Sequence, residues 1–137
     1  MRKITYFVLL FIIVPVLTLG IISCKSNSSE RDDEDSLRGY ADPATETTLQ
    51  GLSENDLGKY IQHGNAEFKT AVTQQIFDAT AAQINSELGT YVSKEFLSTE
   101  EQEGYIIVHY KATFTKGDVG IRMVFDEDHQ VAGQWFE

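Results

Sequence analysis

The sequence predicts an α+β domain in which two or three helices pack on one face of an antiparallel sheet of about four strands. Three observations support this prediction. Apolar residues recur with a helical period up to Gly89 and with a strand-like alternation after it. Short polar turns separate the alternating segments, as in an antiparallel meander. Ahead of this domain, which spans residues 51–137, we expect a signal peptide or anchor helix over residues 1–23 and a flexible acidic tether over residues 24–50.

The N-terminus has the features of a bacterial export signal. Arg2 and Lys3 precede an uncharged, mainly apolar run over residues 4–23. Ser23 then stands directly before Cys24, the only cysteine. This ending resembles a lipobox, which implies cleavage after Ser23 and lipidation of Cys24. The alternative is an uncleaved transmembrane helix, since the run is long enough to cross a bilayer. In either case we expect an extracytoplasmic protein held at the cell membrane or cell envelope.

Residues 24–50 predict a tether because their composition is polar and acidic. Acidic residues cluster between Glu30 and Asp35, and apolar residues are scarce until Leu52. Such a segment buries too little apolar surface to offset the entropy of ordering. We interpret it as a spacer, and the alternatives are an acidic recognition segment or a cation-binding tract.

The net charge and the cysteine count exclude several classes of function. The chain carries a formal charge of −10 at pH 7, and removal of Arg2 and Lys3 with the signal peptide lowers it to −12. Nucleic-acid binding needs a Lys/Arg footprint, so we expect no nucleic-acid partner. With Cys24 lipidated, no thiol remains for a disulfide, a thiolate metal site or a cysteine nucleophile.

The domain begins with helical signals. Ser53 is a suitable N-cap for a first helix that ends at His63-Gly64, and residues 65–71 predict a short helical segment that positions Phe68. A longer helix begins at Thr73 and ends before Gly89. Its apolar stripe consists of Phe77, Ala81, Ile84 and Leu88.

Strand-like alternation follows from Tyr91 onward. The four predicted strands cover residues 91–97, 105–115, 119–125 and 131–136. Turns are predicted at Lys116–Asp118 and at Asp126–His129. The second strand is the clearest, with Val108, Tyr110 and Ala112 on one face and His109 and Lys111 on the other.

Several of these segments resemble an uncharacterised bacterial family, domain of unknown function 3887, within the nuclear transport factor 2-like fold. The resemblance is carried by residues 68–72 and the helix after them, 103–108, 124–128 and 131–136. It spans residues 52–137 and implies a cone-shaped domain in which helices pack on a curled sheet. Members of the family are often exported or lipid-anchored, and the family offers no catalytic motif. The chain is shorter than enzymes of the wider fold, and we expect it to lack their long first helix and therefore their catalytic positions.

The histidines and acidic turns do not predict a metal site. His63, His109 and His129 lack the i, i+4 spacing of two ligands on one helix. The acidic residues that begin at Asp126 place Val131 where a calcium loop needs glycine. We therefore interpret Asp126–His129 as a hairpin turn of solvated acids, and we expect neither a metal nor a cofactor.

One carboxylate carries the enzyme hypothesis. Asp78 lies on the helix that begins at Thr73, and in some enzymes of the resembled fold a carboxylate and a tyrosine transfer protons inside an apolar cone. Tyr110 or Tyr60 would supply the hydroxyl. Asp78 lies off the apolar stripe of its helix, however, which favours exposure to solvent.

The aromatic residues are the remaining functional signal. Five of them are predicted to line a pocket between helices and sheet: Tyr60, Phe68, Phe77, Tyr110 and Trp135. We therefore predict a non-catalytic module that binds a small molecule or another envelope protein. The open sheet face is also suited to a homodimer. The alternative is a small isomerase- or hydratase-like enzyme that uses a pocket carboxylate.

Overall fold

The structure is a computed structural model that describes residues 28–137. Its elements, in chain order, are α1 (Ser28–Glu54), α2 (Leu57–Tyr60), α3 (Ala66–Ala71), α4 (Gln74–Glu87), β1 (Tyr91–Gln102), β2 (Tyr105–Phe114), β3 (Gly117–Phe125) and β4 (Val131–Phe136). Within these residues, no helix combines the length and the apolar character needed to cross a membrane. The predicted signal peptide, Ser23 and Cys24 lie outside the described residues.

The helix α1 replaces most of the predicted tether. It covers residues 28–54, so the expectation of a flexible segment over 24–50 is wrong from Ser28 onward. The residues it buries share one face and are mostly small: Leu37, Ala41, Ala44, Thr45, Thr48, Leu49 and Leu52. Their spacing follows the helical period, and the helix is stabilised by packing this face against the rest of the domain rather than by high hydrophobicity.

The end of α1 explains why the predicted helix boundary at Ser53 is wrong. Asn55 adopts a left-handed conformation with φ 57°. The Asn55 N–H donates to the carbonyl of Leu52, and the Asp56 N–H donates to that of Gly51, which is a Schellman C-terminus. Ser53 therefore closes a helix instead of opening one. The following short helix α2 is capped by Asp56, whose carboxylate accepts from the N–H of Lys59 at 3.0 Å.

The next two helices agree with the sequence prediction. Asn65 caps α3, which places Phe68 in the core. Thr73 caps α4, whose stripe buries Phe77, Ala81 and Ile84. Gly89 follows with φ +80°, a conformation that glycine adopts without strain, and it ends the helical part of the domain.

The four strands form one antiparallel sheet in the order β1-β2-β3-β4. The strand β1 extends to Gln102, beyond its predicted end, and carries two register shifts, at Tyr91/Ser93 and Phe96/Ser98. Bulges of this kind bend a strand and increase its twist. The β2–β3 turn falls at Thr115–Lys116, one residue earlier than predicted. The result is a curled, unclosed sheet.

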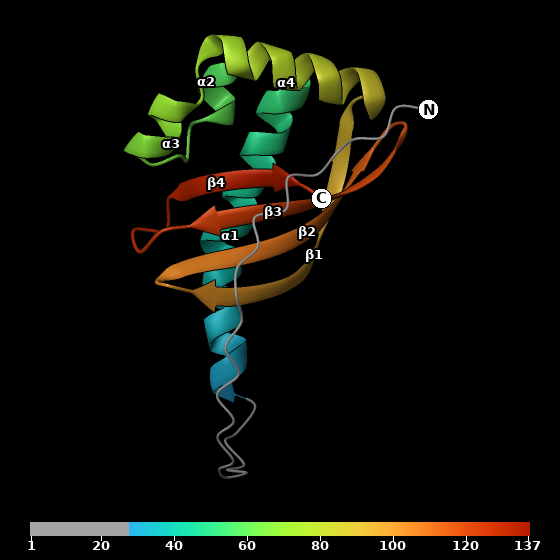
Figure 1. Ribbon diagram of the computed structural model, residues 1–137. Helices are drawn as coiled ribbons and strands as arrows, with labels where there is room; N and C mark the ends of the chain where they lie inside the picture. The colour runs from blue at the N-terminus through green and yellow to red at the C-terminus, as the bar shows by residue number, and fades with distance from the viewer. Residues whose placement is uncertain (1–27) are drawn as a thin grey trace, which may run out of the picture.

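The core lies between the helices and one face of this sheet (Figure 1). In that view α1 runs behind the strands, and α3 and α4 lie above them. Most of the large side chains that this inner face buries come from β2 and β3, and β1 adds Tyr91: Tyr91, Val108, Tyr110, Phe114, Ile121, Met123 and Phe125. The predicted α+β arrangement, with helices on one face of a four-stranded antiparallel sheet, is therefore confirmed.

Candidate functional site

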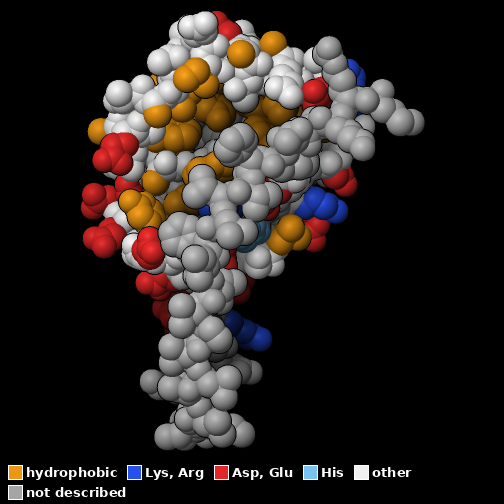
Figure 2. Space-filling model, in the orientation of Figure 1, with side chains coloured by type: hydrophobic (Ala, Val, Ile, Leu, Met, Phe, Trp, Pro, Cys, Tyr) orange, Lys and Arg blue, Asp and Glu red, His pale blue; other side chains and the backbone are white. Residues whose placement is uncertain are grey.

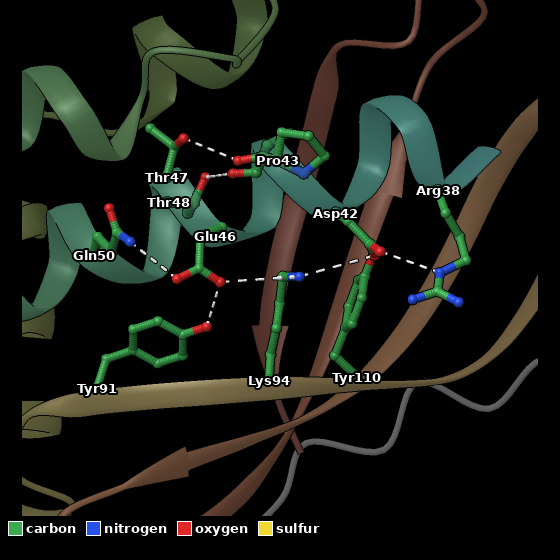
Figure 3. A network of polar contacts seen from close by, with 11 residues as sticks. Arg38, Asp42, Pro43, Glu46, Thr47, Thr48, Gln50, Tyr91, Lys94 and Tyr110 are labelled. Carbon is green, nitrogen blue, oxygen red and sulfur yellow. Dashed lines mark hydrogen bonds and ion pairs between the residues drawn. The ribbon is translucent and has the colours of Figure 1, made fainter. Parts of the chain in front are cut away.

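Two carboxylates of α1 contact two tyrosines of the sheet (Figure 3). Asp42 and Glu46 lie one helical turn apart on the side of α1 that faces β1 and β2. The hydroxyl of Tyr110 donates to Oδ1 of Asp42 at 2.8 Å. The hydroxyl of Tyr91 donates to Oε2 of Glu46 at 2.6 Å. These bonds join residues far apart in the sequence, so they fix α1 against the sheet.

Cations complete this network. Nζ of Lys94 lies 3.8 Å from Oδ1 of Asp42 and 3.9 Å from Oε2 of Glu46. Nε of Arg38 donates to Oδ2 of Asp42 at 3.1 Å, and Nε2 of Gln50 donates to Oε1 of Glu46 at 2.9 Å. Two carboxylates therefore meet two cations, and every carboxylate oxygen has a partner.

The protonation of the tyrosines argues against a catalytic role for the network. Burial, followed by the hydrogen bond and the negative charge of Asp42, raises the pKa of Tyr110. Burial and then Glu46 raise the pKa of Tyr91 in the same way. A general acid or base works best when its pKa is close to the working pH, and these shifts move both hydroxyls further from it. Both hydroxyls therefore stay protonated and donate to their carboxylates, as a structural contact requires.

An open groove of about 520 Å³ lies beside the first turns of α1. It is bounded by α1, the end of β1, the start of β2 and the turn before β4. Its lining residues are Asp33, Glu34, Ser36, Leu37, Tyr40, Thr99, Glu100, Glu101, Ile106 and His129. The volume is in the range of small-ligand sites. The groove contains neither tyrosine–carboxylate pair described above.

Aromatic packing holds one wall of this groove in place. The ring of Tyr40 stacks on that of His129 with centroids 4.1 Å apart and an interplanar angle of 5°. Tyr40 also meets Phe125 edge-on at 5.4 Å. His129 has a positive φ of 60° in the turn between β3 and β4. Because Phe125 is a core residue, the wall is fixed to the interior of the domain.

The five aromatic residues predicted to line a pocket do not line one cavity together. Tyr60 packs against Phe68 and Phe77, with ring centroids 6.0 and 5.1 Å apart, and all three are buried. Tyr110 is buried under α1. Trp135 is 48% exposed on the opposite face of the sheet, where the guanidinium of Arg122 lies 4.9 Å from its ring centroid. The first four are core residues, and Trp135 is a surface residue.

Asp78 does not occupy a pocket either. It is exposed on α4, and its carboxylate accepts a hydrogen bond from Nε2 of Gln74 at 2.7 Å. The expectation that Asp78 is exposed, drawn from its place off the apolar stripe, is therefore confirmed, and Asp78 pairs with neither Tyr110 nor Tyr60. The carboxylate that meets Tyr110 is Asp42, on a helix that the sequence prediction had read as a tether.

The histidines lie apart from one another. His109 sits between Glu100 and Glu137, with nitrogen–oxygen distances of 3.5 and 3.4 Å. His129 stacks on Tyr40, and the His63 carbonyl accepts from the N–H of Val131. Among residues 28–137, no group of three or more His, Cys, Asp or Glu side chains is placed to hold a metal ion.

The acidic turn before β4 has a structural role. The carboxylate of Asp126 accepts from the N–H groups of Asp128 and Gln130 and from Nδ2 of Asn65, at 2.9–3.0 Å. Burial raises its pKa, but these hydrogen bonds and the nearby His129 together lower it below its ordinary value. Glu127 and Asp128 are exposed, as expected for a turn of solvated acids.

The sequence prediction missed the α1 residues of both the network and the groove. Asp42, Glu46, Leu37 and Tyr40 all fall within the predicted tether. A signal was present, because the small buried residues of α1 repeat with a helical period. The polar, acidic composition of residues 24–50 outweighed this signal, and Pro43 in the helix interior adds to the difficulty because proline removes a helical hydrogen bond.

Comparison with known proteins identifies the fold but no activity. A family described as "Protein of unknown function (DUF3887)" matches residues 45–133. The chain is also similar to a protein from Ruminococcus gnavus ATCC 29149 solved by NMR, with a TM-score of 0.52 and 14% sequence identity. That match covers 75% of this chain and 90% of the other, and it shows a shared fold alone. No curated protein matches the sequence.

Proposed function

This chain belongs to the DUF3887 family of proteins of unknown function, so its role has to follow from its own residues, and we propose that it is an exported, lipid-anchored binding module of the cell envelope. The observation that carries the binding role is the open groove beside α1. It combines apolar and aromatic side chains with carboxylates. Among the described residues, the two tyrosine–carboxylate contacts, Tyr91–Glu46 and Tyr110–Asp42, lie outside the groove. They therefore do not supply the groove with a pair for proton transfer.

A side chain that fills the groove tests this role. Ser36 is exposed and lines the groove, so Ser36→Trp blocks it without disturbing the core. Ser86→Trp, on the exposed surface of α4, is the matched control. The full chain is captured from detergent-solubilised membranes, and co-purifying proteins and small molecules are quantified by mass spectrometry. We expect a ligand that is lost with Ser36→Trp and kept with Ser86→Trp. Identical capture by both variants would contradict the proposal.

The lipid anchor is supported by the sequence before the described residues. Arg2 and Lys3, the apolar run over residues 4–23 and Ser23-Cys24 follow the order of a lipoprotein signal. Intact-mass analysis of the membrane-bound protein tests it. We expect a chain that begins at Cys24 and carries acyl groups, and Cys24→Ser to abolish both. A full-length mass at the membrane would instead favour the uncleaved transmembrane helix.

We also propose that the domain is a small nuclear transport factor 2-like fold. Helices that precede a curled antiparallel sheet and pack into its inner face support this assignment. The long α1 adds support, because enzymes of that fold have a long first helix, which the sequence prediction did not expect in this chain. An experimental structure superposed on members of that fold tests the assignment, and helices on the convex face would contradict it.

An enzyme is the second candidate because a carboxylate–hydroxyl pair is present, although the raised pKa of Tyr110 favours a structural role for that pair. Tyr110 and Asp42 form the carboxylate–hydroxyl pair that an isomerase or hydratase could use. Asp42→Asn tests it by mass spectrometry of a metabolite extract incubated with each protein. If the module only binds, neither protein converts any metabolite in the extract. A product that forms with the native chain and not with Asp42→Asn would favour the enzyme.

The predicted homodimer stays a prediction. Tyr105 and Trp135 are 43% and 48% exposed on the outer face of the sheet, which supports that face as the contact surface. Light scattering of the native chain and of Trp135→Ser tests it. A monomeric mass for the native chain across the concentrations used would contradict it.

A further inference from the structure

We propose that the groove beside α1 binds a basic, partly apolar segment of another polypeptide. This inference rests on the proposed binding function and specifies its partner. It depends on two independent properties of the groove, the charge of its rim and the apolar character of its floor.

The rim is acidic on two sides. Asp33 and Glu34 come from α1, and Glu100 and Glu101 come from β1. None of the ten lining residues is a lysine or an arginine. Within the described part of the chain, the one basic side chain at ion-pair distance from these carboxylates is His109, 3.5 Å from Glu100. The rim therefore carries uncompensated negative charge, which steers a basic partner toward it and repels an acidic one.

The floor is apolar and aromatic. Leu37 and Tyr40 come from α1, Ile106 from β2, and His129 from the turn before β4. Leu37 belongs to the core, and Tyr40 is fixed by its contacts with Phe125 and His129. A floor held in this way can receive an aliphatic or aromatic side chain at low cost in conformational entropy. A purely hydrophilic cation would leave it unused.

The acidic surface continues past the groove. A neighbouring hollow of about 280 Å³ is lined by Glu103, Gly104, Tyr105, Asp126, Glu127 and Asp128. Figure 2 shows acidic side chains gathered on the left edge of the molecule, where the β1–β2 and β3–β4 turns lie in Figure 1. A bound chain longer than the groove would therefore meet further carboxylates. This continuity favours an extended polypeptide over a compact small molecule.

Synthetic nine-residue peptides and the full chain test this inference. The first peptide alternates lysine and leucine and carries a fluorophore. The second replaces each lysine by glutamate, and the third replaces each leucine by serine. We expect fluorescence anisotropy to show binding of the first only. We also expect its Kd to rise as salt increases from about 50 to 300 mM, because the screening length for exposed charges shortens from roughly 14 Å to roughly 6 Å over this range.

Charge-neutral variants place the binding in the groove. Glu34→Gln with Glu101→Gln removes one rim charge from each side. We expect the Kd of the lysine–leucine peptide to rise about fivefold, as for the loss of two partly exposed charge contacts. Glu67→Gln with Glu87→Gln is the matched control, because it removes the same charge at exposed positions outside the groove. An equal change in Kd for both double variants would overturn the inference.

Two further outcomes separate this inference from the function on which it rests. If Ser36→Trp abolishes ligand capture but the lysine–leucine peptide does not bind, the groove binds something other than a basic segment, and only this inference fails. If Ser36→Trp changes neither capture nor peptide binding, both proposals fail.

Discussion

At the scale of single residues, the position of α1 depends on polar contacts as much as on packing. Between Leu37 and Leu49, the buried face of α1 consists of Ala41, Ala44, Thr45 and Thr48, which offer little apolar area. The hydroxyl of Thr48 donates to the carbonyl of Ala44, so it bonds its own helix rather than the sheet. The hydrogen bonds of Tyr110 and Tyr91 to α1 supply the directional contacts that such a face lacks.

Removal of the Tyr110 hydroxyl should therefore destabilise the domain. Tyr110→Phe keeps the buried ring and leaves Asp42 with Arg38 and Lys94. We expect the free energy of unfolding, measured by urea denaturation, to fall by about 1.5 kcal/mol, since a hydrogen bond to a charged group is lost. Tyr105→Phe, at an exposed position, should change it by less than about 0.5 kcal/mol. Equal effects would show that the contact with Asp42 is not stabilising.

The buried tyrosines also predict alkaline sensitivity. Burial raises the pKa of Tyr60 from 10.0 to about 12. The neutral phenol is thus favoured in the folded state, and the stability this contributes is present below pH 10.0 and is lost as the pH rises from there to about 12. Between about pH 8 and about pH 11, we expect the free energy of unfolding to fall less for Tyr60→Phe than for the native chain. Parallel losses in the two proteins would contradict this assignment.

At the scale of elements, α1 and α2 approach each other at one glycine. A side chain at Gly51 would clash with the backbone of Tyr60, whereas Gly39, also in α1, has open space around it. We expect Gly51→Ala to lower the free energy of unfolding by about 2 kcal/mol through overpacking. Gly39→Ala should raise it by about 0.5–1 kcal/mol, because alanine favours the helix. Chemical denaturation of both variants measures this contrast, and a stabilising Gly51→Ala would contradict it.

The strands were more predictable than the first helix for a physical reason. Gly89 marks the change of period, and Val131–Phe136 alternates cleanly, so both were identified correctly. The α1 helix lacks large apolar residues along much of its length and contains Pro43. Its stability comes from tertiary packing and from Tyr91 and Tyr110, which are distant in sequence. A prediction based on local composition does not include such contacts.

The boundary of the domain can be tested directly. A chain that begins at residue 51, the predicted start, lacks the core residues Leu37, Ala41, Ala44 and Leu49. We expect it to lose cooperative thermal unfolding, while a chain that begins at residue 28 keeps it. Circular dichroism and calorimetry measure the difference. A cooperative transition in the shorter chain would mean that α1 is dispensable for the fold.

At the scale of the whole molecule, the groove could not be read from the sequence because it joins three distant segments. Tyr40, Ile106 and His129 belong to α1, β2 and the last turn, and only the fold brings them together. Their residue types did not predict a groove, since aromatic residues are usually core residues, as Tyr60, Phe68 and Phe77 are. The overall negative charge predicted only that nucleic acid is not a partner, and it did not predict a groove.

The early start of α1 also sets how far the domain stands from the bilayer under the proposed lipidation. Only residues 25–27 separate Cys24 from Ser28, and three residues span at most about 10 Å. Because the groove uses the first turns of α1, a partner would have to reach it close to the lipid headgroups. A partner embedded in the same membrane would then meet it by lateral diffusion, at an effective concentration that a protein free in solution would not reach.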